Sequence, residues 1–241
     1  MRFVVILCLI LAITSGRDAR PDLDVGRLQI GSFSFRTLAE GKEVGRSRIQ
    51  IHRAADSGNY VFSNLVTGSF SQSWESVATS TFAPVSAKLS FGEGGAARTA
   101  FDLSYHGNRV TGFIASRKEP SKRREINESV SHDTVDQRID WAAVMALKDF
   151  VEGKEFQFHV YDPGTGNSVV SGRIGKSETT AVPAGSFETV RISYRIDKRG
   201  HAETYEVFVT KEAPRFQVKE KFPNGSVSEL VERTATTPDR S

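Results

Sequence analysis

Five histidines are the residues of this sequence best suited to binding a metal or transferring protons near neutral pH. They are His52, His106, His132, His159 and His201, and none is spaced with another ligand residue for a metal site on one helix face. His106 and His201 fall in expected turns, while His52 and His159 fall on the solvated side of expected strands. We therefore predict surface histidines, no metal site and no cofactor.

Three residue types of a hydrolytic triad stand side by side at Ser131, His132 and Asp133. Neighbours on one loop cannot face one another as a triad requires, and the sequence has no Gly-x-Ser-x-Gly nucleophile turn. Capping of a helix that begins here is the simpler role for Ser131 and Asp133. We therefore expect no catalytic residue in this stretch.

Two carboxylates, Asp136 and Asp140, are spaced one helical turn apart on what should be a polar face. Solvation or pairing with Arg138 accounts for them there. The glycine-rich segments 92–95 and 164–167 lack the strand-to-helix context and the following Lys-Ser or Lys-Thr of a phosphate loop, so we read them as hairpin turns. We predict that the protein is not an enzyme, and keep an enzyme acting on a glycan or lipid as a third alternative.

The N-terminus has the build of a secretory signal peptide. One arginine precedes an apolar run from Phe3 to Ile13, which is shorter than the roughly 20 residues of a membrane-spanning helix. We predict cleavage near Gly16 and a periplasmic or secreted protein, with an uncleaved N-terminal membrane anchor as the alternative. Cys8, the single cysteine, lies within the run, so the mature chain would have no disulfide and no cysteine-bound metal.

The net charge bears on which classes of partner the protein can bind. The formal net charge of +3 becomes +2 when Arg2 is removed with the signal (3 − 1 = 2), which is too balanced to indicate nucleic-acid binding. We see no transmembrane span in the mature chain. The predicted organisation is a signal peptide at 1–16, a polar leader at 17–26, a β-rich domain at 27–233 in two halves joined near 117–132, and a disordered tail at 234–241.

Apolar residues recur mainly with a period of two, which is typical of half-buried strands. The clearest run is Val190, Ile192, Tyr194 and Ile196, which alternate with polar or charged residues. One-sided strands favour an antiparallel sheet, and frequent turn sequences such as Asp162-Pro163-Gly164 favour hairpins between neighbours. We predict an all-β protein, a curved antiparallel sheet or partial barrel of about ten to twelve strands.

One segment departs from this period. Val135, Ile139 and Ala143 are spaced for one face of a helix, so we predict one substantial helix over residues 133–150, packed across the sheet. A second, shorter helical or irregular piece is expected around Phe70 to Val77.

Several short segments resemble the bacterial envelope family known as domain of unknown function 3108 (DUF3108). They are Phe33-Ser34-Phe35-Arg36 through Glu43-Val44-Gly45-Arg46, Phe82-Ala83-Pro84-Val85, Val151-Glu152-Gly153-Lys154, and Val182-Pro183-Ala184-Gly185-Ser186-Phe187-Glu188-Thr189. The resemblance spans roughly Leu28 to Val231. It implies an all-β, half-barrel-like exported protein, loosely similar to periplasmic lipoprotein and lipid carriers, and it implies no catalytic residues.

Large apolar residues are plentiful, with 16 phenylalanines and two tryptophans. A curved sheet can fill itself with such side chains or leave a groove for an apolar ligand. We predict a non-enzymatic envelope protein that binds an apolar or lipid-like ligand on its concave surface, the alternative being a protein-interaction or structural module with a filled core. The expected partner is thus a lipid or an envelope protein and not nucleic acid. The candidate ligand-binding residues are Phe33, Phe35, Phe62, Trp74, Trp141, Phe156, Phe158 and Tyr194.

Overall fold

A computed structural model describes residues 21–116, 119, 121–198 and 200–235. The predicted signal peptide, most of the predicted leader and residues 236–241 lie outside the described residues. The strands in the first half are β1 (Gly31–Ala39), β2 (Lys42–Arg53), β3 (Tyr60–Gly68), β4 (Gln72–Ala78), β5 (Pro84–Phe91), β6 (Arg98–His106), β7 (Arg109–Ala115) and β8 (Arg123–Ser129). Those in the second half are β9 (Val135–Asp136), β10 (Glu155–Asp162), β11 (Gly166–Val182), β12 (Gly185–Lys198), β13 (His201–Thr210), β14 (Gln217–Lys221) and β15 (Val227–Ala235).

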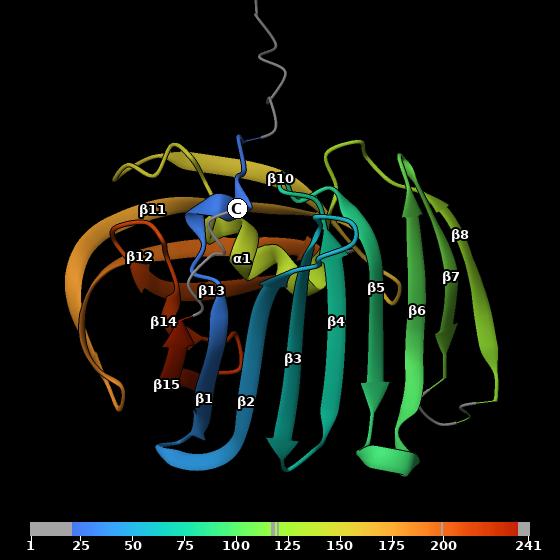
Figure 1. Cartoon of the computed structure of the whole chain (residues 1–241), viewed down its shortest axis with the longest axis horizontal. Helices are drawn as coiled ribbons and strands as arrows, with labels where there is room; N and C mark the ends of the chain where they lie inside the picture. The colour runs from blue at the N-terminus through green and yellow to red at the C-terminus, as the bar shows by residue number, and fades with distance from the viewer. Residues whose placement is uncertain (1–20, 117–118, 120, 199, 236–241) are drawn as a thin grey trace, which may run out of the picture.

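All fifteen strands of the described chain form one sheet, in the order β8-β7-β6-β5-β4-β3-β2-β1-β15-β14-β13-β12-β11-β10-β9. The chain starts at the middle of the sheet, builds outward by hairpins to β8, crosses to the other edge at β9 and returns to pair β15 with β1 (Figure 1). Every pairing is antiparallel except that of β9 with β10. The predicted fold class is confirmed, with more strands than the expected ten to twelve.

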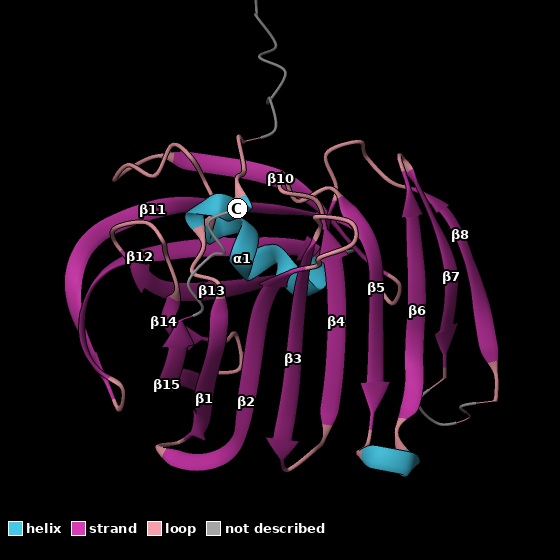
Figure 2. Ribbon diagram, viewed as in Figure 1, coloured by secondary structure: helices cyan, strands magenta, loops and turns pink. Residues whose placement is uncertain are grey.

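The sheet curls until its two edge regions meet. Arg124 Nη2, on β8, donates to the Pro163 carbonyl oxygen at 2.6 Å, in the turn that follows β10. Asn167 Nδ2, on β11, donates to the Ser129 carbonyl oxygen at 3.0 Å. These bonds join strands that are far apart in the sheet order, so the molecule is a partial barrel as predicted (Figure 2).

The predicted helix over 133–150 is wrong in extent. The segment forms β9, a 3-10 turn η3 (Gln137–Ile139) and a short helix α1 (Asp140–Met145). Val135 pairs with Val160 of β10, and Asp136 caps η3 by accepting from the Arg138 backbone N–H at 3.0 Å, so these residues make no helical hydrogen bonds. One short helix does lie across the sheet, enclosed by its curve (Figure 2).

Two further segments differ from expectation. The piece predicted as helical or irregular around 70–77 contains β4, in which Trp74 lies between Asn64 of β3 and Leu89 of β5. The predicted connection near 117–132 contains β8, whose inward residue Ile126 is buried. A single apolar position among charged neighbours is too weak a pattern to identify β8 from sequence.

The interior is packed with aromatic residues. Phe62 and Phe82 are fully buried, with ring centroids 5.7 Å apart. Pro183 and Ala184 form the turn between β11 and β12, where Gly185 has φ of +130°. Phe187 beside it packs edge-on against Phe216, with ring centroids 5.6 Å apart.

Two further 3-10 turns are η1 (Val25–Arg27) and η2 (Gly94–Ala96). No helix among the described residues has the length and apolar character needed to cross a membrane.

Candidate functional site

The concave face of the sheet encloses a cavity of about 710 Å³. Its walls come from β1 to β5 on one side and from β12 to β15 on the other, and η3 and α1 form its floor. The end away from α1 is lined by residues that include Val44 of β2 and Phe70 of the β3–β4 connection, which are 39% and 56% exposed. Ligand pockets in proteins have volumes of roughly 300–1,000 Å³, so this cavity has room for a small molecule.

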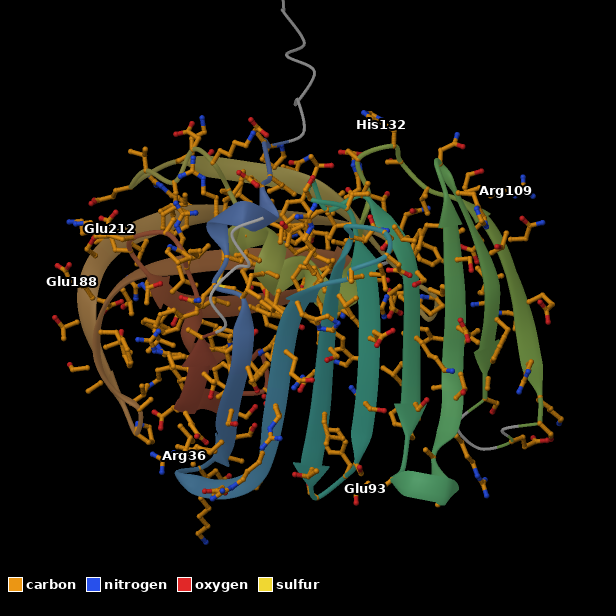
Figure 3. The ribbon with its side chains drawn as sticks, in the orientation of Figure 1. Arg36, Glu93, Arg109, His132, Glu188 and Glu212 are labelled. Carbon is orange, nitrogen blue, oxygen red and sulfur yellow. The ribbon has the colours of Figure 1, made fainter. Side chains whose placement is uncertain are left out.

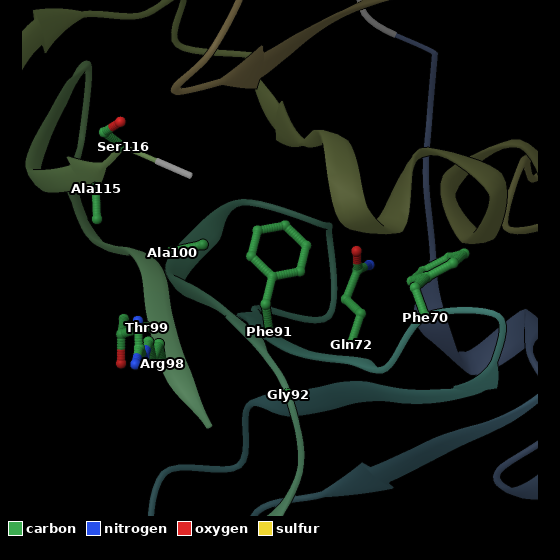
Figure 4. Close-up of a pocket in the computed structure, with 9 residues that line it drawn as sticks. All are labelled: Phe70, Gln72, Phe91, Gly92, Arg98, Thr99, Ala100, Ala115 and Ser116. Atoms are coloured by element: carbon green, nitrogen blue, oxygen red, sulfur yellow. The ribbon is translucent and has the colours of Figure 1, made fainter. Parts of the chain in front are cut away.

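A second hollow of about 640 Å³ continues from the first along β4 to β7. The two share Phe70 and Gln72 as lining residues. Phe91 lines the second hollow, close to Ala100 and Ala115 (Figure 4). Together the two hollows form an elongated space whose walls are largely apolar.

Two buried carboxyl groups lie at the floor of the main cavity. Asp140 is the first residue of α1 and is 7% exposed, and Glu220 of β14 is 9% exposed. The Trp141 backbone N–H donates to Asp140 Oδ1 at 2.6 Å. Gln217 Nε2 donates to Glu220 Oε2 at 3.1 Å. Both carboxyl groups line the cavity, so a bound molecule could reach them.

The environment of this pair changes its protonation. Burial raises the pKa of Asp140 to about 7, and the Trp141 backbone N–H partly opposes the shift. Burial raises the pKa of Glu220 to about 8, with a further increase from the charge of Asp140 and a decrease from the Gln217 hydrogen bond. The pair therefore holds protons near neutral pH, where it can accept hydrogen bonds, exchange protons or bind a cation.

The basic groups near the floor are already engaged elsewhere. Arg138 binds Asp136 Oδ1 at 2.8 Å and also contacts Asp162. Lys198 Nζ lies 2.6 Å from Glu203 Oε2. Within the described part of the chain, no lysine, arginine or histidine forms an ion pair with Asp140 or Glu220. These two carboxyl groups therefore face the cavity without a resident counter-ion.

Three amide oxygens at the cavity also have no hydrogen-bond partner among the described residues. They are Asn64 Oδ1, Gln137 Oε1 and Gln217 Oε1, and all three residues line the cavity. Gln217 is 4% exposed, and its Nε2 is held by Glu220, which fixes the orientation of the amide. Because buried acceptors are normally satisfied, these oxygens point to hydrogen-bond donors supplied by a bound molecule or water.

The structure separates the predicted ligand-binding residues into three groups. Trp74, Trp141 and Tyr194 line the main cavity. Phe33 and Phe35 border a small adjoining void of about 10 Å³, together with Trp141. The remaining three pack in the core, and they are Phe62, Phe156 and Phe158.

The floor carboxylates were not recognised from the sequence as a site. Pairing with Arg138, one of the two roles expected for these aspartates, is confirmed for Asp136, whose Oδ1 lies 2.8 Å from Arg138 Nε. Solvation is wrong for both, because Asp136 and Asp140 are 0% and 7% exposed. The long helix on which that prediction depended does not form, so neither residue lies on a polar helix face. Glu220 had a usable signal, since it lies two residues after Val218 and so on the same inward face of β14.

The histidines lie away from the cavity. His132 is exposed on the outer surface (Figure 3). His159 Nδ1 lies 3.0 Å from Asp133 Oδ2, so Asp133 pairs with this histidine instead of capping a helix as predicted. In the ranges that the structure describes, no group of three or more histidine, cysteine, aspartate or glutamate residues is arranged to hold a metal ion.

Comparison with known proteins gives a family match and similar folds. The sequence model described as "Protein of unknown function (DUF3108)" matches residues 22–231. The crystal structure of a β-barrel-like protein of domain of unknown function DUF1849 from Brucella abortus superposes with a TM-score of 0.55 and 10% identity, covering 88% of this chain and 99% of that one. A protein with YmcC-like fold from Bacteroides fragilis gives a TM-score of 0.40 and 9% identity, covering 88% of this chain and 99% of that one. A search of curated proteins gave no significant sequence match. At 10% identity the similarity to the Brucella abortus protein shows a shared fold and nothing about function. The TM-score of 0.40 is too low for any conclusion from the Bacteroides fragilis protein.

Proposed function

This chain belongs to the DUF3108 family, as its short motifs predicted, and we propose that it is an exported, non-enzymatic protein of the cell envelope that binds an amphipathic ligand inside its curved sheet. The observation that carries the proposal is the cavity of about 710 Å³, which has apolar side chains such as Val66, Trp74 and Leu89 on its walls and two carboxyl groups at its floor. A ligand with a long apolar part and a polar end matches both surfaces.

The walls provide the apolar part of the binding energy. Trp74 and Leu89 are only partly buried, although each packs against one of the two hydrophobic clusters of the interior. Covering such surface is worth about 25 cal/mol for each Å² removed from water. An acyl or alkyl chain lying against β4 and β5 would bury this surface.

Export is the sequence-based part of the proposal. The charged start, the apolar run and the small residues before Arg17 have the order of a signal peptide. A protein-interaction module with a filled core, the alternative expected from the sequence, is less well supported, because the interior contains a large cavity.

Asp140 and Glu220 favour a second candidate function. Paired carboxyl groups whose pKa values are raised by burial to about 7 and about 8 are suited to acid–base catalysis on a glycan or lipid. This candidate predicts turnover of a bound molecule, whereas the carrier proposal predicts that the molecule is recovered unchanged. Extraction and identification of the bound molecule after prolonged incubation separates the two.

Native mass spectrometry of the protein purified without detergent from an exporting host tests the proposal. We expect a reproducible extra mass that organic extraction assigns to an amphipathic molecule. Val66→Trp would fill the cavity from β3 and should abolish the extra mass. Leu65→Trp is the control, because Leu65 is the preceding residue on the same strand, is 46% exposed and is absent from the cavity lining. An apoprotein that takes up no added amphiphile, or equal loss in both variants, would contradict the proposal.

A further inference from the structure

We infer that the floor of the cavity binds a primary ammonium group, so that the favoured ligand is a long-chain amine or a lipid with an ammonium head group. This inference rests on the proposed function and specifies the polar end of its ligand. It is carried by the acceptor groups that line the cavity, and by the fact that the cations nearby, Arg138 and Lys198, form their ion pairs with other carboxylates among the described residues.

Three of the side chains at the floor offer acceptor atoms to a ligand. The carboxyl groups of Asp140 and Glu220 line the cavity, and so does Gln217, whose Oε1 is buried and has no partner within the described residues. The amide of Gln217 cannot turn to hide this oxygen without losing the bond from its Nε2 to Glu220. A primary ammonium carries three N–H donors and no acceptor, which complements this set.

The donors nearest the floor are engaged with other groups. Tyr205 Oη donates to Glu203 Oε2 at 2.8 Å, and Lys198 binds the same carboxylate at 2.6 Å. Trp141 Nε1 donates to the Arg138 carbonyl oxygen at 2.8 Å. These donors are therefore bound by other acceptors, and a ligand ammonium could donate to Asp140 and Glu220 in their place.

Charge and aromatic surface favour an ammonium over a carboxylate. An ammonium stabilises the ionised forms of Asp140 and Glu220, whereas a fatty-acid carboxylate would oppose their ionisation, because like charges in a buried site repel. The aromatic side chains Trp141, Tyr194 and Tyr205 also line the cavity, and the two tyrosine rings stack with centroids 5.2 Å apart. Aromatic faces attract cations, so this lining adds to the preference.

Protonation provides independent support. Burial raises the pKa values of Asp140 and Glu220 to about 7 and about 8. An incoming cation would lower both values, so that binding near neutral pH should release protons to the buffer. Calorimetry in buffers of different ionisation enthalpy measures this release.

Isothermal titration of the full chain with four dodecyl compounds tests the inference. The probes are dodecylammonium, dodecyltrimethylammonium, dodecanol and dodecanoate, each below its critical micelle concentration. We expect dodecylammonium to bind at least about tenfold more tightly than the other three, which equals about 1.4 kcal/mol. A second pair, lysophosphatidylethanolamine and lysophosphatidylcholine, separates the sources of the ammonium. Preference for the former indicates a lipid head group, and equal binding of this pair indicates a free long-chain amine.

Asp140→Asn/Glu220→Gln should remove the preference for dodecylammonium while leaving dodecanol binding within about twofold. The control variant Glu75→Gln/Asp102→Asn replaces the same number of carboxyl groups at positions outside the cavity lining and should keep the preference. Circular dichroism checks folding, and Glu220→Gln alone serves if the double variant does not fold. Dodecanoate or dodecanol binding as tightly as dodecylammonium would overturn the ammonium inference and leave the carrier proposal intact. Failure of every probe to bind would overturn both.

Discussion

Asp140 gives the protein a titration that can be measured without any ligand. Burial raises the pKa of this carboxyl from 3.8 to about 7 in the folded protein. The Trp141 backbone N–H, Arg138 and Lys198 oppose the shift, and Asp136 adds to it. Asp140→Asn removes the titration and retains a side-chain oxygen that can accept from Trp141, where the bond is 2.6 Å long.

A rise of roughly 3 pKa units corresponds to about 4 kcal/mol of unfolding free energy, taken as an upper limit because Asp140 borders a cavity that water can enter. Below about pH 4 the carboxyl is protonated in both states, and its contribution to stability is complete. As the pH rises toward about 7, the unfolded chain ionises first and the free energy of unfolding falls. Asp140→Asn should therefore be more stable than wild type near pH 8, by up to about 4 kcal/mol, and no more stable near pH 4.

Urea unfolding followed by tryptophan fluorescence, at several pH values from about 4 to about 8, measures this difference. Asp102→Asn is the control, since the Asp102 side chain is 48% exposed and should shift stability by less than about 0.5 kcal/mol. The reasoning is refuted if Asp140→Asn is no more stable than wild type near pH 8, or if its stability keeps the same dependence on pH.

Three other substitutions test the same structure by thermal or urea unfolding. Glu220→Gln should also flatten the fall in stability with rising pH, because burial raises the pKa of Glu220 from 4.5 to about 8; an unchanged slope would contradict this. Arg138→Met should cost about 3–5 kcal/mol, because it leaves the carboxylate of Asp136 buried without its partner, and a loss under about 1 kcal/mol would show that this ion pair is not needed. Phe62→Ala should cost about 3–5 kcal/mol at a fully buried position, and Phe70→Ala, at a position that is 56% exposed, should cost less than about 0.5 kcal/mol; similar losses would contradict the packing described above.

Local patterns predicted a curved antiparallel sheet, but not the contacts that join its two edge regions. The alternation from Val190 to Ile196 identifies one buried face because successive side chains of a strand point to opposite sides, and this holds whatever the strand packs against. The turn at Val182 to Gly185 is equally local. The contact between Arg124 and Pro163, which helps to close the partial barrel, joins segments from the two halves of the chain and has no signature in either.

The helix shows how tertiary contacts override a local pattern. Val135, Ile139 and Ala143 have helical spacing, and all three are buried as an apolar helix face would be. The pairing of Val135 with β10 and the capping by Asp136 nevertheless limit the helix to Asp140–Met145. The spacing of apolar residues in the sequence predicted which of them are buried, whereas long-range backbone pairing determined the conformation in which they are buried.

The candidate site also depends partly on local sequence and partly on tertiary structure. The sequence by itself determined that Glu220 follows Val218 on the inward face of a strand, and that aromatic residues are plentiful enough to line a curved sheet. Only the tertiary structure decided that Asp140 and Glu220 meet at one cavity floor, and that Arg138 and Lys198 nearby form their ion pairs with other carboxylates. The physical reason is that burial and charge pairing depend on all the elements surrounding a group, and here those elements come from both ends of the described chain.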